Sequence, residues 1–126
     1  MPIIKFPKNP NNEPPFFSNI REDGYHVYSL TNAKKPGFYP PELPDYPGAA
    51  LKDLKEDDII TIRVFFGIGK GKKMRVDGGY VDLRIEVVEK GTIMGSVITE
   101  LPEEFALKRG QSIEVFEEEI LYKAGT

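Results

Sequence analysis

Proline is concentrated at one end of this chain: ten of its eleven prolines lie in the first 47 residues, and only Pro102 falls later. Proline fixes the backbone φ angle and lacks an N–H donor, so this half cannot be mainly helix or central strand. One short run, 25–30, follows Asp23-Gly24 and predicts a strand. The segment 36–47 is expected to be extended and polyproline-like. We therefore interpret residues 1–50 as a proline-rich arm with one strand, packed over the rest of the chain through five aromatic residues: Phe16, Phe17, Phe38, Tyr39 and Tyr46.

Strand patterns fill the second half of the chain. The run 59–66 is strongly β-forming and apolar on both faces, which is typical of a central strand. Apolar and polar residues alternate through 80–89, so that one side of this strand is expected to face the core through Val81, Leu83, Ile85 and Val87. A tight turn at Lys90-Gly91 is followed by further predicted strands at 92–99, 112–116 and 119–122.

Strands at this spacing, separated by turn residues, favour an all-β or β-rich α+β fold. We expect a small, partly open barrel or a strongly bent antiparallel sheet, with the proline-rich arm at its N-terminal side. The chain reads as a single domain over 1–126, in which 51–126 forms the barrel-like core. A chain of 126 residues is long enough to bury such a core.

A short internal echo supports this interpretation. The segment 54–62 reads Leu-Lys-x-x-Asp-x-Ile-x-Ile, and 107–115 reads Leu-Lys-x-x-Gln-x-Ile-x-Val. Both segments predict a turn that leads into an alternating strand, with the leucine plugging one end of a small barrel.

Cysteine and hydropathy patterns bear on location. The chain has no cysteine, which excludes disulfides and thiolate metal sites and suits a reducing compartment. The N-terminal residues lack the apolar stretch of a secretory signal, and no segment approaches the roughly 20 apolar residues that cross a membrane. We expect a soluble cytoplasmic protein with no membrane association.

Charge is unevenly distributed along the chain. The formal net charge of −3 disfavours general nucleic-acid binding. Four basic residues nevertheless lie in one short loop, 67–75. The segment 100–119 is acidic, because it contains seven glutamates and only two basic residues. The glycines of the loop resemble a phosphate cradle, but a P-loop requires Gly-Lys followed by Ser or Thr and then a helix. Lys73 replaces that hydroxyl and a strand follows, so the loop predicts either a solvated connection or a cationic site for phosphate or an acidic protein surface.

No catalytic set emerges from the residue types. His26 is the only histidine and lies within a predicted strand, where a structural or simply exposed role is expected. The four serines lack a nucleophile elbow, and no calcium loop or zinc ligand set is present. The carboxylates are plentiful but none is singled out as a catalytic pair. We predict no metal and no cofactor.

The segment from Tyr80-Val81-Asp82-Leu83 through Gly95-Ser96-Val97-Ile98 and Leu107-Lys108-Arg109-Gly110 to Glu119-Ile120 resembles an uncharacterised bacterial domain family of unknown function. The resemblance covers about residues 54–122. It implies a β-rich fold, a bacterial origin and a setting rich in toxin-immunity genes. It implies no catalytic residue.

The acidic C-terminal segment, the aromatic arm and the missing catalytic set favour a non-catalytic, immunity-like protein-binding module, with another protein as its partner. Two alternatives remain open: a small-barrel nucleic-acid-binding protein that uses the cationic loop with Phe65, Phe66 or Tyr80 as stacking rings, and a ligand-binding or carboxylate-based enzyme. The sequence leaves the oligomeric state open. The residues predicted to bind a partner are Lys70, Lys72, Lys73, Arg75, Tyr80 and Arg84.

Overall fold

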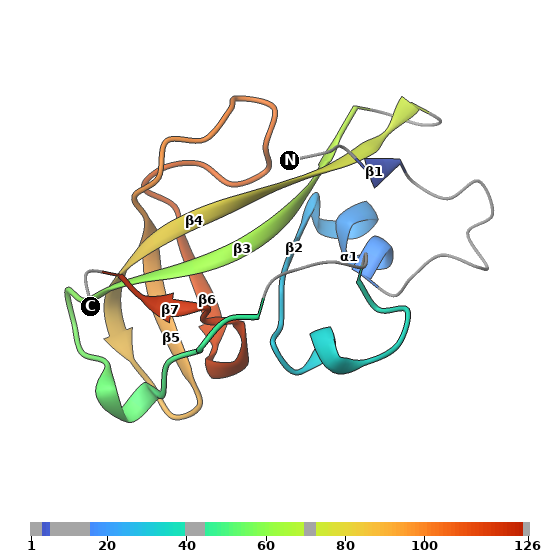
Figure 1. The fold of residues 1–126 in the computed structure, drawn as a ribbon. Helices are drawn as coiled ribbons and strands as arrows, with labels where there is room; N and C mark the ends of the chain where they lie inside the picture. Colours follow the sequence, from blue (N-terminus) through green and yellow to red (C-terminus); the bar gives the residue numbers. More distant parts are fainter. Residues whose placement is uncertain (1–3, 6–15, 40–44, 70–72, 125–126) are drawn as a thin grey trace.

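One antiparallel sheet organises the chain, and it curls into a half-barrel (Figure 1). The computed structural model describes residues 4–5, 16–39, 45–69 and 73–124. The strands are β2 (Tyr25–Val27), β3 (Ile59–Ile68), β4 (Arg75–Val88), β5 (Thr92–Val97) and β6 (Ser112–Phe116), in the order β2-β3-β4-β5-β6. Two short strands pair at the margins, β1 (Ile4–Lys5) with β4 and β7 (Tyr122–Lys123) with β3. The predicted strongly bent antiparallel sheet is confirmed.

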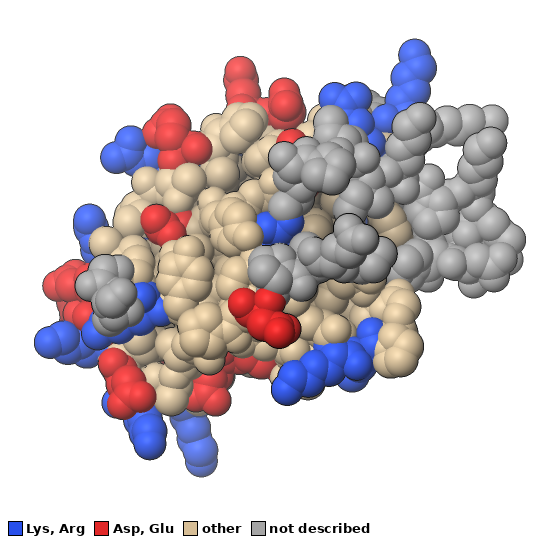
Figure 2. Space-filling model, viewed as in Figure 1, with Lys and Arg blue, Asp and Glu red and all other residues tan. Residues whose placement is uncertain are grey.

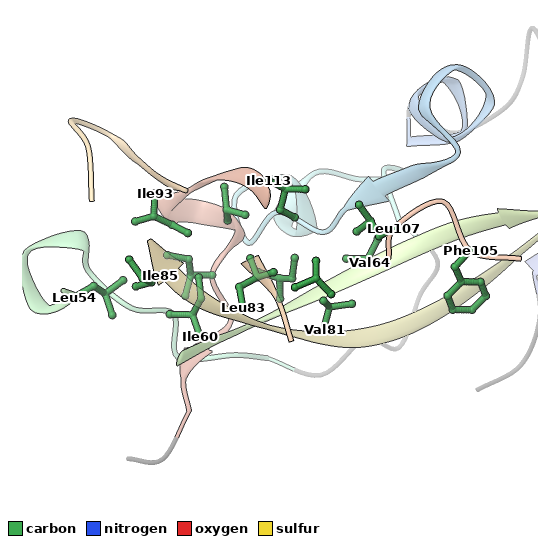
Figure 3. Packing of buried hydrophobic residues seen from close by; sticks show 14 of the residues in the cluster. Leu54, Ile60, Val64, Val81, Leu83, Ile85, Ile93, Phe105, Leu107 and Ile113 are labelled. Atoms are coloured by element: carbon green, nitrogen blue, oxygen red, sulfur yellow. The ribbon is translucent and has the colours of Figure 1, made fainter. Parts of the chain in front are cut away.

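The concave side of the sheet holds the main hydrophobic core. The central strand β3 contributes every second residue to this core. Four of these side chains are fully buried: Ile60, Ile62, Val64 and Phe66. Loops plug the two ends, with Leu54 at one end of the cluster and Phe105 at the other (Figure 3). The ring of Phe105 stacks on Phe66 with a centroid distance of 4.1 Å. Burial of these apolar side chains is the main favourable contribution to folding.

A β-bulge in β4 overturns one predicted orientation. Val81, Leu83 and Ile85 face the core as expected, but the register with β5 shifts between Ile85 and Val87. The extra residue reverses the alternation, so that Val87 points outward and is 43% exposed. The prediction that Val87 faces the core was therefore wrong.

The internal echo forms the same turn twice. The Lys55 N–H donates to the Asp58 carboxylate over 3.0 Å, and the Lys108 N–H donates to the Gln111 amide oxygen over 3.2 Å. The leucine before each lysine is buried in the main core. The residue before each acceptor, Asp57 or Gly110, has a positive φ of 73° or 91°. The predicted pair of turns leading into β3 and β6 is confirmed.

The N-terminal half contains a helix that the sequence interpretation missed. Helix α1 (Phe16–Asp23) ends at Gly24, which has a φ of +83° and whose N–H donates to the Ile20 carbonyl. This is the αL termination that glycine allows. From the sequence, Asp23-Gly24 predicted only the start of a strand. In the structure the same pair also ends helix α1. The predicted strand at 25–30 is present but shorter, as β2.

Helix α1 lies on the convex side of the sheet and builds a second apolar cluster there (Figure 1). Its buried members are Phe17, Ile20, Tyr28, Phe65, Val76 and Leu121. Phe38, Tyr39 and Tyr46 pack against them, which confirms the expected packing of the aromatic arm for these residues and Phe17. The side chain of Phe16 and most of the proline-rich segments (1–3, 6–15 and 40–44) lie outside the described residues.

The C-terminal segment differs in detail from expectation. Residues Glu117–Glu119 form a 3-10 turn, η5, where a strand was predicted to begin, and β7 starts only at Tyr122. Two further 3-10 turns, η2 (Asn32–Lys34) and η3 (Leu51–Asp53), lie in the connections. No helix in the described part of the chain is long and apolar enough to cross a membrane.

Candidate functional site: a tyrosine face on the convex side of the sheet

Three tyrosines gather on the convex side of β3, β4 and β7, and we call them the tyrosine face: Tyr46, Tyr80 and Tyr122. The strand register explains two of these positions, because Tyr80 lies opposite Arg63 and Tyr122 lies opposite Thr61. Residues opposite each other in antiparallel strands point to the same side of the sheet. Tyr80 is 46% exposed and Tyr122 is 36% exposed, so both rings are open to solvent.

A buried arginine supports this face from below. Arg63 is only 1% exposed although it carries a charge in the middle of the central strand. Its guanidinium carbon lies 4.9 Å from the Tyr80 ring centroid and 5.5 Å from the Phe65 ring centroid. Cation–π attraction of this kind is stronger where water is excluded. The arginine therefore supports the Tyr80 ring from the side of the sheet.

The tyrosine hydroxyl groups are also linked. The Tyr46 and Tyr80 hydroxyl oxygens lie 2.6 Å apart, and the two rings meet edge to face with centroids 6.3 Å apart. Burial, followed by the hydrogen bond with Tyr80, raises the pKa of Tyr46 above its usual value. The Tyr46 hydroxyl group is consequently neutral at physiological pH, and its hydrogen bond positions the Tyr46 and Tyr80 rings before anything binds to them.

Polar contacts between neighbouring strands steady the same region. The Thr61 hydroxyl donates to the Asp82 carboxylate over 2.7 Å, and the Asp82 N–H donates to the Thr99 hydroxyl over 2.7 Å. Beside Tyr122, the Lys123 ammonium pairs with the Asp58 carboxylate at 3.4 Å. In Figure 2 uncharged side chains predominate on the part of this side that the structure describes; basic and acidic groups also lie near the middle, and the other Lys, Arg, Asp and Glu side chains lie mainly around the margin.

His26 belongs to a buried network rather than to a surface site. Its Nδ1 lies 2.9 Å from the Asn19 amide nitrogen and its Nε2 lies 2.9 Å from the Tyr39 hydroxyl, which also accepts the Ser29 N–H over 2.8 Å. Burial lowers the pKa of His26 to about 4, so the ring is neutral at physiological pH. These contacts give His26 a structural role, which is one of the two roles expected from the sequence.

An open groove of about 540 Å³ lies between the loop after β2, the segment before η3 and the turn η5. Its charged lining comprises Lys34, Asp53, Glu117 and Glu118. Glu117 is already engaged, because its carboxylate accepts the Leu51 N–H over 2.9 Å. Within the ranges that the structure describes, no three His, Asp or Glu side chains are grouped so that they could hold a metal ion.

Of the residues predicted to bind a partner, the four that the structure describes lie at two places on β4 and the hairpin before it. Lys70 and Lys72 lie outside the described residues. Lys73 and Arg75 are exposed at the far end of the β3–β4 hairpin, and Arg75 lies opposite Ile68, whose side of β3 faces the core. Tyr80 and Arg84 share the convex side of β4, roughly 13 Å apart along the strand.

Two of the three proposed stacking rings are not accessible. Phe65 is 1% exposed and Phe66 is 0% exposed, because they fill the two opposite cores of the sheet. The prediction that either could stack on a base was wrong, and only Tyr80 remains. The sequence interpretation also missed Arg63, Tyr46 and Tyr122. A lone charge inside the apolar run 59–66 was the available signal for Arg63.

No protein-family model, curated protein or solved structure matches this chain.

Proposed function

We propose that this protein is a non-catalytic binding module that docks another protein on its tyrosine face. The observation that carries the proposal is the exposed ring of Tyr80, held over the buried Arg63, together with the exposed Tyr122 on the same side of the sheet. Tyrosine and arginine are enriched among the residues that dominate binding energy at protein interfaces. Interfaces of this kind have a core that is depleted of charged residues and a polar rim.

Rigidity adds to the argument. A side chain that is ordered before binding loses less conformational entropy when the complex forms. The hydrogen bond between Tyr46 and Tyr80 and the guanidinium of Arg63 restrict the Tyr80 ring in this way. The Tyr80 ring therefore supplies contact area at low entropic cost, as tyrosines do in antibody paratopes.

The charge of the molecule selects the kind of partner. The formal net charge is −3, and the segment 100–119 is strongly acidic. Complementary charge accelerates association and disfavours acidic partners. We propose a globular partner with a basic surface, which agrees with the immunity-like binding role that the sequence predicts.

The test compares the native protein with variants of the face. Affinity capture with mass spectrometry identifies candidate partners, and each candidate is then purified and titrated against the protein. Tyr80→Ala combined with Tyr122→Ala is expected to weaken binding about thirtyfold or more, as loss of a binding hot spot does. Val87→Ala, at a comparably exposed position elsewhere on the convex side, serves as the matched control and is expected to bind normally.

A second variant separates the ring from its hydrogen bond. Tyr80→Phe keeps the aromatic ring over Arg63 but removes the hydroxyl that meets Tyr46. It is expected to retain most of the affinity, with a loss of tenfold or less. Binding that is unchanged in the double alanine variant, while its circular dichroism matches that of the native protein, would refute the proposal; so would failure to find any partner that depends on these two rings.

A further inference from the structure

Strand β6 forms one margin of the half-barrel, and one of its two backbone edges is not paired with any strand of the described chain. It pairs with β5 in a register that places Gly95 opposite Ile113 and Ile93 opposite Val115. The Val97 N–H donates to the Gln111 carbonyl over 2.9 Å. Hydrogen-bonded pairs alternate along antiparallel strands, so Ile113 and Val115 direct their backbone groups toward β5.

The intervening residues therefore direct their N–H and C=O groups away from the sheet. These residues are Ser112, Glu114 and Phe116. The strand's end is already capped, because the Phe116 N–H donates to the Glu119 carboxylate over 2.9 Å. The open stretch of backbone is thus centred on Glu114. An edge of this kind is a template for a further strand.

The side chains along this edge alternate in character. Ile113 and Val115 are buried in the core, whereas Ser112 and Glu114 are exposed and Phe116 is 50% exposed. A strand added here would direct alternate side chains to the same side of the sheet as Ile113 and Val115, where apolar residues are expected. Its other side chains would lie on the convex side beside Glu114 and Phe116.

The local charge specifies what those other side chains are. Glu114 is followed by the three carboxylates of η5. The nearby cations are engaged elsewhere, since the Arg109 guanidinium pairs with the Glu100 carboxylate at 3.0 Å and the Lys108 ammonium donates to the Glu103 carbonyl. Opposite charges directly across two strands stabilise the pair, and like charges destabilise it. The complementary residue beside Glu114 is a lysine or an arginine.

A second copy of this chain does not meet that requirement. Full-length antiparallel pairing of β6 with β6 of another copy, matching Ser112 with Phe116, would place Glu114 opposite Glu114. Two carboxylates would then face each other at the centre of the new ladder. Self-pairing is therefore disfavoured by the same residue that favours a basic strand.

We propose that the edge of β6 receives an extended segment of a partner protein that alternates apolar and basic residues and adds to the sheet as a further strand. Backbone hydrogen bonds to Ser112 and Glu114 supply affinity, and the side chains beside Glu114 and Phe116 supply specificity. This inference goes beyond the proposed function, because β6 and β7 pair with different strands and the site shares no residue with the tyrosine face.

The test uses a short synthetic peptide that alternates valine with lysine, titrated into the isotopically labelled protein. Amide chemical-shift changes are expected in and around 112–116 and in the facing strand β5. N-methylation of the peptide residues that face β6 is expected to abolish these changes. N-methylation of the alternate residues, which face solvent, is the matched control and is expected to leave them in place.

Charge reversal provides the second arm. Replacing the peptide's lysines by glutamates is expected to weaken binding to the native protein about fivefold. Glu114→Lys is expected to invert that preference, and Tyr80→Ala is expected to leave it unchanged, which separates this site from the tyrosine face. Shift changes that leave both β5 and the residues in and around 112–116 unaffected, or binding that is insensitive to N-methylation or to charge, would overturn the proposal; so would dimerisation of the native protein through β6.

Discussion

Two partly buried ionisable side chains, His26 and Glu119, are expected to make the folding stability of this protein depend on pH. Burial lowers the pKa of His26 to about 4 and raises the pKa of Glu119 to about 7. In both cases the lower dielectric disfavours the charged form. The two groups act on stability in opposite directions, which makes each one a separate prediction.

Glu119 is expected to destabilise the folded protein as it ionises. Its carboxylate accepts the Phe116 N–H, but burial and the neighbouring Glu118 and Glu114 carboxylates disfavour the charge. The folded state therefore holds the proton more tightly than the unfolded state does. The stability contribution of protonated Glu119 is complete below about pH 4.5 and is lost as the pH rises through 7.

The variant Glu119→Gln keeps a hydrogen-bond acceptor for Phe116 without the charge. Relative to the native protein it should gain up to about 3 kcal/mol of unfolding free energy above pH 7, and little below pH 4.5. Urea unfolding across this range measures the difference. Glu118→Gln, the same change on an exposed neighbour, is the control; an equal gain in both variants would contradict the assignment.

His26 is expected to titrate far below an exposed histidine. Because its folded pKa of about 4 lies below the unfolded value of 6.5, the stability that it contributes is complete above pH 6.5 and is lost as the pH falls toward 4. It is the only histidine, so its ring protons are assigned without ambiguity in an NMR titration. A titration midpoint near 6.5 would show that the ring is not shielded from water in the network with Asn19 and Tyr39.

At the scale of the elements, the sequence predicted the central strands correctly but did not predict the β-bulge in β4 or helix α1. The pattern of 59–66 and the turn at Lys90-Gly91 were sufficient for β3 and for the β4–β5 hairpin, because alternation and turn chemistry are local properties. The bulge after Ile85 was not predicted, because it depends on the register with β5. Helix α1 is only 8 residues long and is stabilised by what it packs against.

The docking of α1 on β3 depends on one glycine. A Cβ atom on Gly67 would lie 2.8 Å from the Ile20 Cγ2 atom, which is closer than van der Waals contact permits. Gly67→Ala should push the helix away from the sheet and cost about 1–3 kcal/mol of unfolding free energy. Chemical denaturation measures the cost.

Gly79→Ala is the matched control, because its added Cβ would meet Phe66 at an ordinary distance of 3.9 Å. Little or no destabilisation is expected there. If the two variants were equally stable, the close approach of Ile20 would not be what requires glycine at position 67.

At the scale of the whole molecule, the half-barrel brings its two margins toward each other. A Cβ atom on Gly24, just before β2, would lie 2.9 Å from the Ala106 Cβ atom. Beyond the other end of β2, the Leu30 N–H donates to the Glu118 carbonyl in η5 over 2.7 Å. The segments that flank β6 thus meet those that flank β2, while the outer edge of β6 itself pairs with no strand of the described chain.

Glu114 is expected to keep the protein from associating through this edge. Glu114→Val removes the like-charge contact at the centre of a β6–β6 pair and adds a strong strand former. Sedimentation velocity over a range of concentrations should show greater self-association of this variant than of the native protein. Glu104→Val removes the same charge from an exposed turn outside the strands and should behave like the native protein; equal association of both variants would exclude β6 as the contact.

The sequence by itself determined that the chain forms a bent antiparallel sheet, where its central strands run, and that two similar turns lead into β3 and β6. These properties follow from period-two alternation and turn residues, which act over a few neighbours along the chain. Only the tertiary structure decided that Phe65 and Phe66 are buried on opposite sides, and that Arg63 lies beneath an exposed Tyr80. The physical reason is that exposure depends on what covers each side of the sheet, and here the cover comes from helix α1 and from Tyr46, which are distant in sequence.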